Sequence, residues 1–239
     1  MTNPKAAMLV IGDEILSGRT RDANMHHLAG KLTEIGVDLA EVRVVGDDRD
    51  VIVDAVQSLS DRYATVFTSG GIGPTHDDIT ADCMAAAFGQ TIDVRDDARA
   101  ILQAHYDKAG TELNAARLRM ARIPEKAVLI ENPVSAAPGF TIGNVHVMAG
   151  VPSVFQAMVE SVLPGLTGGA PLHSKTYTVH RGEGDIAGPL GQIAQERPEL
   201  SIGSYPFQRD GRYGSNIVVR GTDETVIAAA IADLQTALG

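Results

Sequence analysis

Cysteine, tryptophan and basic clusters are scarce in this sequence of 239 residues. It has no tryptophan and one cysteine, Cys83. A single cysteine cannot form an internal disulfide bond. The formal net charge is −10 and no block of Lys and Arg is present, which disfavours nonspecific binding to nucleic acid or to an anionic membrane. The first apolar run, residues 6–12, is too short to span a bilayer and lacks a signal-peptide cleavage pattern. We therefore expect a cytoplasmic protein with no nucleic-acid or membrane partner.

Apolar residues make up 44% of the chain, which is enough to bury the core of one large domain and a small one. Short apolar runs alternate with segments of helical periodicity from the start of the chain, and this order predicts a β-α-β-α-β arrangement. The expected strands are 6–11, 38–46 and 64–69, and the expected helices are 22–36 and 49–62. Buried strands joined by helices are typical of an α/β fold in which a mostly parallel sheet lies between two helical layers.

Further elements extend this domain, and a second domain follows it. Helices are expected at 80–88, 96–122 and 153–163, with strands near 127–131 and 145–150. Residues 164–172 concentrate glycine and proline, so we place a linker there, between a first domain at 1–168 and a second at 171–239. The second region alternates between strand-like segments at 174–182, 200–206 and 212–221 and helical ones at 185–197 and 223–238. This order predicts a small α+β domain.

A glycine-rich turn follows the third expected strand in the segment "TSGGIGPTHDDIT", residues 68–80. Gly70, Gly71 and Gly73 permit positive φ angles and let a ligand approach the backbone, and the next helix presents free N–H groups. Such a turn suits phosphate, but Asp77 and Asp78 beside it would repel one. A divalent cation that bridges carboxylate and phosphate oxygens removes this conflict. The segment therefore predicts a phosphate–metal site.

Structural roles for these residues remain open at this stage. Asp77 or Asp78 could instead cap the following helix, because Asp is a preferred residue at a helix N-terminus. The glycines lack both the spacing of a dinucleotide fingerprint and the Gly-Lys-Ser/Thr ending of a P-loop, so neither cofactor is predicted. Cys83 falls on the apolar side of that helix and is expected to be a core residue rather than a nucleophile.

Acidic residues also follow the first two expected strands, in 12–24 and in 46–50. Because parallel strands end at the same edge of a sheet, we expect the acids of the three loops to converge there. These acids are Asp13, Glu14, Asp47, Asp77 and Asp78. Arg19 and Arg21 lie in the same region and could neutralise the negative charge of a ligand's phosphates. The alternative is that both are solvated residues at the protein surface.

Four segments together resemble a known family: "GDEILSG" (12–18) with Asp22 and Asn24, residues 68–82, "NPVSAAPGF" (132–140) and "AGVPS" (149–153). The chain resembles the molybdopterin-binding MoaB/Mog-type domain, and more closely the amino-terminal part of the CinA-like competence/damage-inducible proteins. The resemblance covers essentially the whole chain. It implies that the glycine loop and two aspartates surround ligand phosphates, with Asp47 and Asp78 as the catalytic pair. The phosphate contacts that we expect are Gly70, Gly71, Gly73, Thr75, Asn24 and Arg19.

The same resemblance implies a chemistry. CinA-like amino-terminal domains are associated with metal-dependent hydrolysis of ADP-ribose to AMP and ribose 5-phosphate, whereas Mog-type relatives adenylylate molybdopterin. We expect a divalent ion (Mg²⁺, Mn²⁺ or Co²⁺) held by Asp47 and Asp78, with Asp13, Glu14 and Asp77 as further ligands or bases.

Departures from the family pattern leave a second hypothesis open. Ser135, Ala149 and Val154 stand where the family often has a glycine, a proline and an acid, so non-catalytic binding of molybdopterin or a nucleotide is the alternative. The chain stops before the nicotinamide mononucleotide deamidase domain of many relatives, so no deamidation is expected. A homo-oligomer, dimer or trimer, is also expected from the resemblance.

Overall fold

The computed structural model describes residues 3–209 and 211–239 of the chain. The chain folds into two compact units, Met1–Gly169 and Ala170–Gly239. The division falls within the glycine- and proline-rich segment 164–172. In the described residues, no helix is both long and apolar enough to cross a lipid bilayer.

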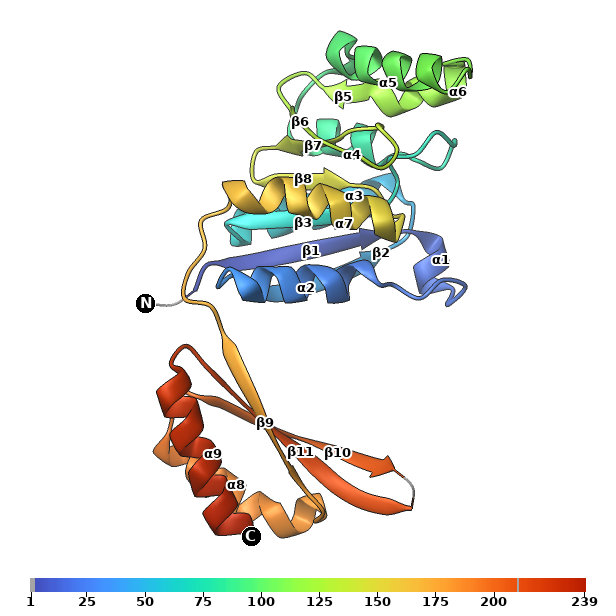
Figure 1. Cartoon of the computed structure of the whole chain (residues 1–239). Helices are drawn as coiled ribbons and strands as arrows, with labels where there is room; N and C mark the ends of the chain where they lie inside the picture. Colours follow the sequence, from blue (N-terminus) through green and yellow to red (C-terminus); the bar gives the residue numbers. More distant parts are fainter. Residues whose placement is uncertain (1–2, 210) are drawn as a thin grey trace. The chain divides into compact units, whose positions relative to one another are not determined.

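A six-stranded sheet forms the centre of the first unit (Figure 1), in the order β2-β1-β3-β8-β7-β6. Strands β2, β1, β3 and β8 are parallel to one another. At one edge β7 pairs antiparallel with β8, and β6 pairs antiparallel with β7. The strands are β1 (Lys5–Ile11), β2 (Asp38–Val45), β3 (Thr65–Ser69), β6 (Val128–Ile130), β7 (Gly139–Ile142) and β8 (Val145–Met148). The expected mostly parallel sheet is thus confirmed.

Helices cover both faces of this sheet. On one face α3 (Arg49–Arg62) packs against β1, and α4 (Thr80–Ala87) and α5 (Asp96–Lys108) extend the same core, which includes odd-numbered residues of β1 such as Leu9. On the other face α2 (Asn24–Glu34) and α7 (Pro152–Val162) pack against even-numbered ones, such as Met8. Residues 6–11 of β1 are therefore all buried, as a strand between two helical layers requires. The three-layer α/β/α arrangement is confirmed.

The helical region expected over 96–122 is divided into three helices by a break after α5. Helix α5 ends at Lys108, and Gly110 follows with a φ of +64°, a conformation that stops helices. The chain then forms α6 (Ala115–Leu118), begun by an Asn114 side chain that accepts a hydrogen bond from Arg117 N at 3.0 Å. The short helix η1 (Arg119–Ala121) and strand β5 (Arg122–Pro124) follow, and β5 pairs with β4 (Ile92–Val94). The remaining short elements of this unit are α1 (Asp13–Leu16) and η2 (Leu163–Gly165).

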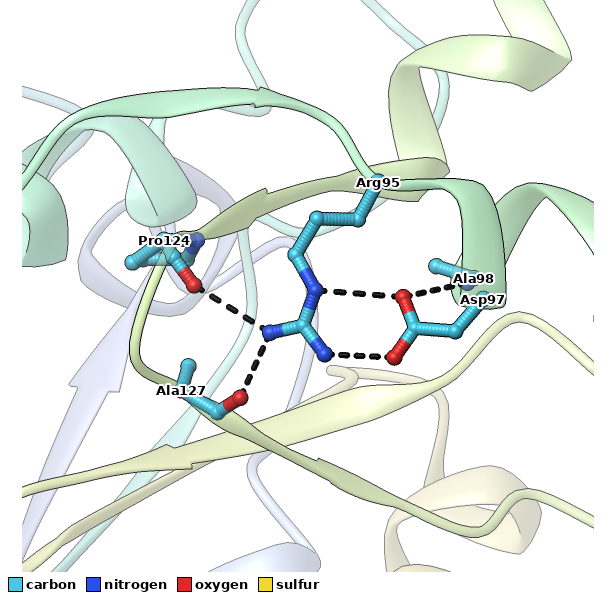
Figure 2. Close-up of polar contacts among 5 residues, drawn as sticks. All are labelled: Arg95, Asp97, Ala98, Pro124 and Ala127. Carbon is cyan, nitrogen blue, oxygen red and sulfur yellow. Dashed lines mark hydrogen bonds and ion pairs between the residues drawn. The ribbon is translucent and has the colours of Figure 1, made fainter.

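Arg95 ties this rearranged segment to the start of α5, as Figure 2 shows. Its guanidinium group donates to the carbonyl oxygens of Pro124 and Ala127 and to the Asp97 carboxylate, with Nε 3.1 Å from Oδ1. Asp97 also accepts a hydrogen bond from Ala98 N at 2.8 Å. The hydrogen bonds from Arg95 hold the pKa of Asp97 below its usual value. Arg95 therefore ties the end of β5 and the turn after it to the start of α5.

The second unit is a small α+β domain, as predicted. It contains β9 (His173–Val179), α8 (Glu183–Glu196), β10 (Ser201–Arg209), β11 (Arg212–Gly221) and α9 (Glu224–Leu238). The strands form an antiparallel sheet in the order β10-β11-β9. Ile217 and Val219 on β11 are fully buried against apolar side chains of α8 and α9, including Ile186, Ile227 and Leu234. These contacts give the unit a hydrophobic core of its own.

Candidate functional site

The loops that follow β1, β2, β3 and β8 meet at one edge of the sheet. Gly12 N donates to Val45 O at 3.0 Å, and Gly70 N donates to Met148 O at 3.1 Å. An open cleft of about 600 Å³ lies at this edge, large enough for a nucleotide or a pterin. Its lining includes Gly12, Glu14, Asp47, Gly70, Gly71, Gly73, Asp77, Asp78, Asn132, Ser135, Gly150 and Val154.

At one position of the glycine loop the backbone requires glycine, and at another a side chain would displace Asp78. Gly70 has a φ of +111°, and a Cβ atom there would lie 2.1 Å from the carbonyl oxygen of Ile11. A Cβ atom on Gly73 would lie 2.6 Å from Oδ2 of Asp78. The glycines therefore let the loop pack against β1 and let the Asp78 carboxylate lie directly against the backbone.

Asp78 is braced by the loop and does not cap α4. Its Oδ2 atom accepts hydrogen bonds from Thr75 N at 2.8 Å and from Thr75 Oγ1 at 2.6 Å. Helix α4 begins at Thr80, and no side chain accepts a capping hydrogen bond at its N-terminus. The helix-cap alternative for Asp77 and Asp78 is therefore wrong. Thr75 is exposed, does not line the cleft, and orients the Asp78 carboxylate.

Asp47 also lines the cleft and lies in a negatively charged environment. It is half-buried, and its Oδ2 atom accepts a hydrogen bond from Asp13 N at 3.1 Å. Burial, followed by the negative charges of Asp13, Glu14 and Asp77, raises the pKa of Asp47 above its usual value. The structure thus brings together Asp47, Glu14, Asp77 and Asp78 as lining residues, whereas the Asp13 side chain is exposed beside them.

The carboxylates do not form a preformed metal cage. Across residues 3–209 and 211–239, no three His, Cys, Asp or Glu side chains are grouped closely enough to hold a metal ion by themselves. The donor set nevertheless fits Mg²⁺-type chemistry, because such ions commonly use one or two carboxylates together with substrate phosphates and water. The unfavourable charge at Asp47 is the feature that a cation would relieve.

Arg119, which the sequence motifs do not single out, is next to the glycine loop. Its Nη2 atom lies 3.4 Å from the carbonyl oxygen of Asp78, and its Nε atom is buried without a hydrogen-bond partner. It lines a hollow of about 20 Å³ whose other lining residues include Gly71, Gly73 and Asp78, and these three also line the cleft. No motif marks Arg119, because its position depends on how the chain folds after α5.

Arg19 and Asn24, which were predicted to contact phosphate, are placed differently. Arg19 is exposed and is not a lining residue of the cleft. Asn24 is buried, and its Nδ2 donates to Ser69 Oγ at 2.7 Å and to Gly150 O at 2.8 Å. The Gly150 carbonyl can only accept, so this orientation of the amide is fixed. Asn24 thus connects the loops after β3 and β8 and presents no free N–H group to a phosphate.

The loop after β6 supplies another wall of the cleft. Asn132 is buried, and its Oδ1 accepts hydrogen bonds from Val134 N at 3.0 Å and Ser135 N at 3.1 Å. Ala136 in this loop has a φ of +63°, the left-handed conformation that favours glycine. The Asn-Pro sequence is a signal for this turn, although the motifs alone give Asn132 no role.

Val154 and Cys83 are both buried. Val154 is 6% exposed and packs in the core between α2 and α7, so it brings no charge to the cleft that it lines. Cys83 is completely buried, and burial raises the pKa of its thiol to about 11. A thiol with such a pKa stays protonated at neutral pH and is not a nucleophile.

Comparisons with known proteins agree with this architecture. The family described as "Probable molybdopterin binding domain" matches residues 7–168, and the family described as "FAD synthase, middle domain" matches residues 171–239. A Thermococcus kodakarensis protein, TK1472, is 34% identical over 97% of this chain and 96% of its own length. A CinA-like protein of Geobacter metallireducens is 31% identical over 96% of this chain, which spans 57% of that relative.

A solved structure gives the same picture. The crystal structure of a CinA protein of unknown function from Thermoplasma acidophilum superposes with a TM-score of 0.62 and is 34% identical. The match covers 67% of this chain and 98% of that one. The parallel sheet with its cleft at the carboxyl ends of the strands defines a MoaB/Mog-type α/β domain. The chain belongs to the probable molybdopterin-binding domain family, and within it to the CinA-like proteins.

Proposed function

We propose that this protein hydrolyses the pyrophosphate bond of a nucleotide such as ADP-ribose with the help of a divalent metal ion. The observation that carries the proposal is the glycine loop with Asp78 against its backbone, lining the same 600 Å³ cleft as the negatively charged surroundings of Asp47. Backbone amides suit phosphate oxygens, and the carboxylates suit a cation that neutralises them.

Each residue has a distinct task in this proposal. Gly71 and Gly73 let the phosphates approach the backbone, and Thr75 holds the Asp78 carboxylate in place. Asp47 and Asp78 would hold Mg²⁺, Mn²⁺ or Co²⁺, which supplies Lewis-acid stabilisation of the phosphate charge and lowers the pKa of water. Attack of water on one phosphorus breaks its bond to the bridging oxygen. The products are AMP and ribose 5-phosphate.

The direct test is incubation of the purified protein with ADP-ribose and each metal ion. AMP and ribose 5-phosphate in equal amounts, formed with Mg²⁺, Mn²⁺ or Co²⁺ and not with EDTA, support the proposal. Saturable binding of ADP-ribose without products at any metal concentration contradicts it.

A second candidate function is non-catalytic binding of molybdopterin or a nucleotide, and a related one is molybdopterin adenylylation in cofactor biosynthesis. The observation in favour of a binder is Val154, a buried apolar residue where the family often has an acid. A thermal-shift panel of nucleotides and pterins separates the candidates, because a ligand that binds the folded state raises its melting temperature.

A further inference from the structure

Arg119 is an unusual basic residue in this chain. Of the half-buried Lys and Arg side chains in residues 3–209 and 211–239, most form ion pairs with carboxylates, for example Arg122 with Asp82. Arg117 instead lies over the ring of Tyr106, 4.8 Å from its centroid. Within the described part of the chain, Arg119 has neither kind of partner, and its hydrogen bond is the 3.4 Å contact to Asp78 O.

A half-buried guanidinium group without an anion is costly, and this protein carries a surplus of carboxylates that could have paired with it. The unpaired group lies where the hollow beside Gly73 and Asp78 offers space for an additional polar atom. Gly71 and Gly73 of the glycine loop line the same hollow. The hollow has room for about one water-sized group, so one phosphate oxygen could enter it next to Arg119 while the rest of that phosphate lies in the adjoining cleft.

The cleft and the hollow therefore differ in their charged groups. The cleft is lined by the carboxylates of Glu14, Asp47, Asp77 and Asp78, which repel an anion unless a cation is bound. The hollow adds the unpaired Arg119, beside Asp78 and the ion pair of Arg122 with Asp82. Gly71, Gly73 and Asp78 line both spaces, so the two positions adjoin, as two linked phosphates require.

We propose that Arg119 binds one phosphate of a diphosphate independently of metal, while the carboxylates and a metal ion hold the other. This inference rests on the proposed function, and it assigns one of the two phosphates of the substrate to Arg119. Arginine is suited to the task, because its planar group can donate two parallel hydrogen bonds to phosphate oxygens.

Isothermal titration of the full-length protein with inorganic pyrophosphate in EDTA measures the metal-independent affinity for phosphate, which is the contribution assigned to Arg119. Arg119→Met should bind pyrophosphate about 10- to 100-fold more weakly than the parent, as expected for loss of a hydrogen bond between charged groups. The affinity of Arg119→Lys for pyrophosphate should lie between those of the parent and of Arg119→Met. Arg117→Met is the matched control, since it removes the same charge from a half-buried position two residues away, and it should bind like the parent.

A second comparison tests the diphosphate specificity. The parent should prefer pyrophosphate to orthophosphate and ADP to AMP in the presence of Mg²⁺, and Arg119→Met should lose most of that preference. Melting curves of each variant establish that it is folded, and Arg119→Gln replaces Arg119→Met if the latter unfolds.

The outcomes distinguish this inference from the proposed function. Equal pyrophosphate affinity of parent and Arg119→Met in EDTA, or no metal-free binding by the parent, overturns the role of Arg119 even if ADP-ribose is hydrolysed. Metal-free binding that depends on Arg119, without hydrolysis of ADP-ribose by the parent, supports Arg119 and rejects the hydrolase.

Discussion

Replacing Asp78 by asparagine separates the structural role of this residue from its chemistry. In the structure its carboxylate accepts two hydrogen bonds from Thr75, at 2.8 and 2.6 Å. Asparagine retains an acceptor oxygen but no charge, so Asp78→Asn should cost about 1 kcal/mol, the difference between charged and neutral hydrogen bonds at a half-buried site. For a unit of this size that lowers the melting temperature by roughly 2–4 °C. Asp78→Ala removes both bonds and should cost about 1–3 kcal/mol.

Activity should respond much more steeply than stability. Both variants should lose metal-dependent hydrolysis of ADP-ribose, because neither has the charge that holds a divalent cation. The measurement is turnover across titrations of Mg²⁺, Mn²⁺ and Co²⁺, together with a melting curve for each protein. Asp54→Asn on the exposed side of α3 is a charge-matched control and should behave like the parent. If Asp78→Asn keeps the parent's turnover and metal dependence, Asp78 only braces the loop.

Three further predictions follow from single contacts. The raised pKa of Asp47 means that its charge destabilises the fold increasingly as the pH rises through that pKa. Asp47→Asn should therefore raise the melting temperature in EDTA at pH 7 and reduce the increase in melting temperature that added metal causes. An unchanged melting temperature would contradict this. Arg95→Gln should lower the free energy of unfolding in urea by about 1–3 kcal/mol, because the carbonyl groups of Pro124 and Ala127 lose a charged donor. A decrease smaller than the error of the measurement would argue against the hydrogen bonds drawn in Figure 2. Ala136→Gly should raise stability by about 0.5–1 kcal/mol, because glycine adopts the left-handed conformation without strain, and a lower denaturation midpoint would refute this reasoning.

The sequence predicts the parallel part of the fold well because its strands are buried on both faces. The apolar run 6–11 and the helical period of 49–62 are long enough to identify β1 and α3, and the glycine loop marks the end of β3. Once these strands are parallel, the convergence of Asp47 and Asp78 at one edge follows from topology.

Shorter elements carry too few residues for a period to be recognised. Strands β4 and β7 have three and four residues, and neither was predicted. The helical region 96–122 is predicted without its break at Gly110, which changes the direction of the chain before α6 and η1. For the same reason no pattern could identify Arg119, whose position beside Asp78 depends on a contact across 41 residues.

Charge in the cleft is divided among its walls, and this division constrains how an adenylyl ligand can lie. Carboxylates come from the loops after β1, β2 and β3. Arg119 lines the adjoining hollow together with Gly71, Gly73 and Asp78. The wall formed by Ala149, Val151 and Val154 carries no charge. Phosphates are stabilised near the glycine loop, whereas a flat base or pterin ring gains most by covering apolar surface. Val154 is buried, so the exposed Val151 supplies most of the apolar surface on which the ring of the proposed ligand would pack. The proposed metal ion would then depend on the carboxylates of the other walls, Glu14, Asp47, Asp77 and Asp78.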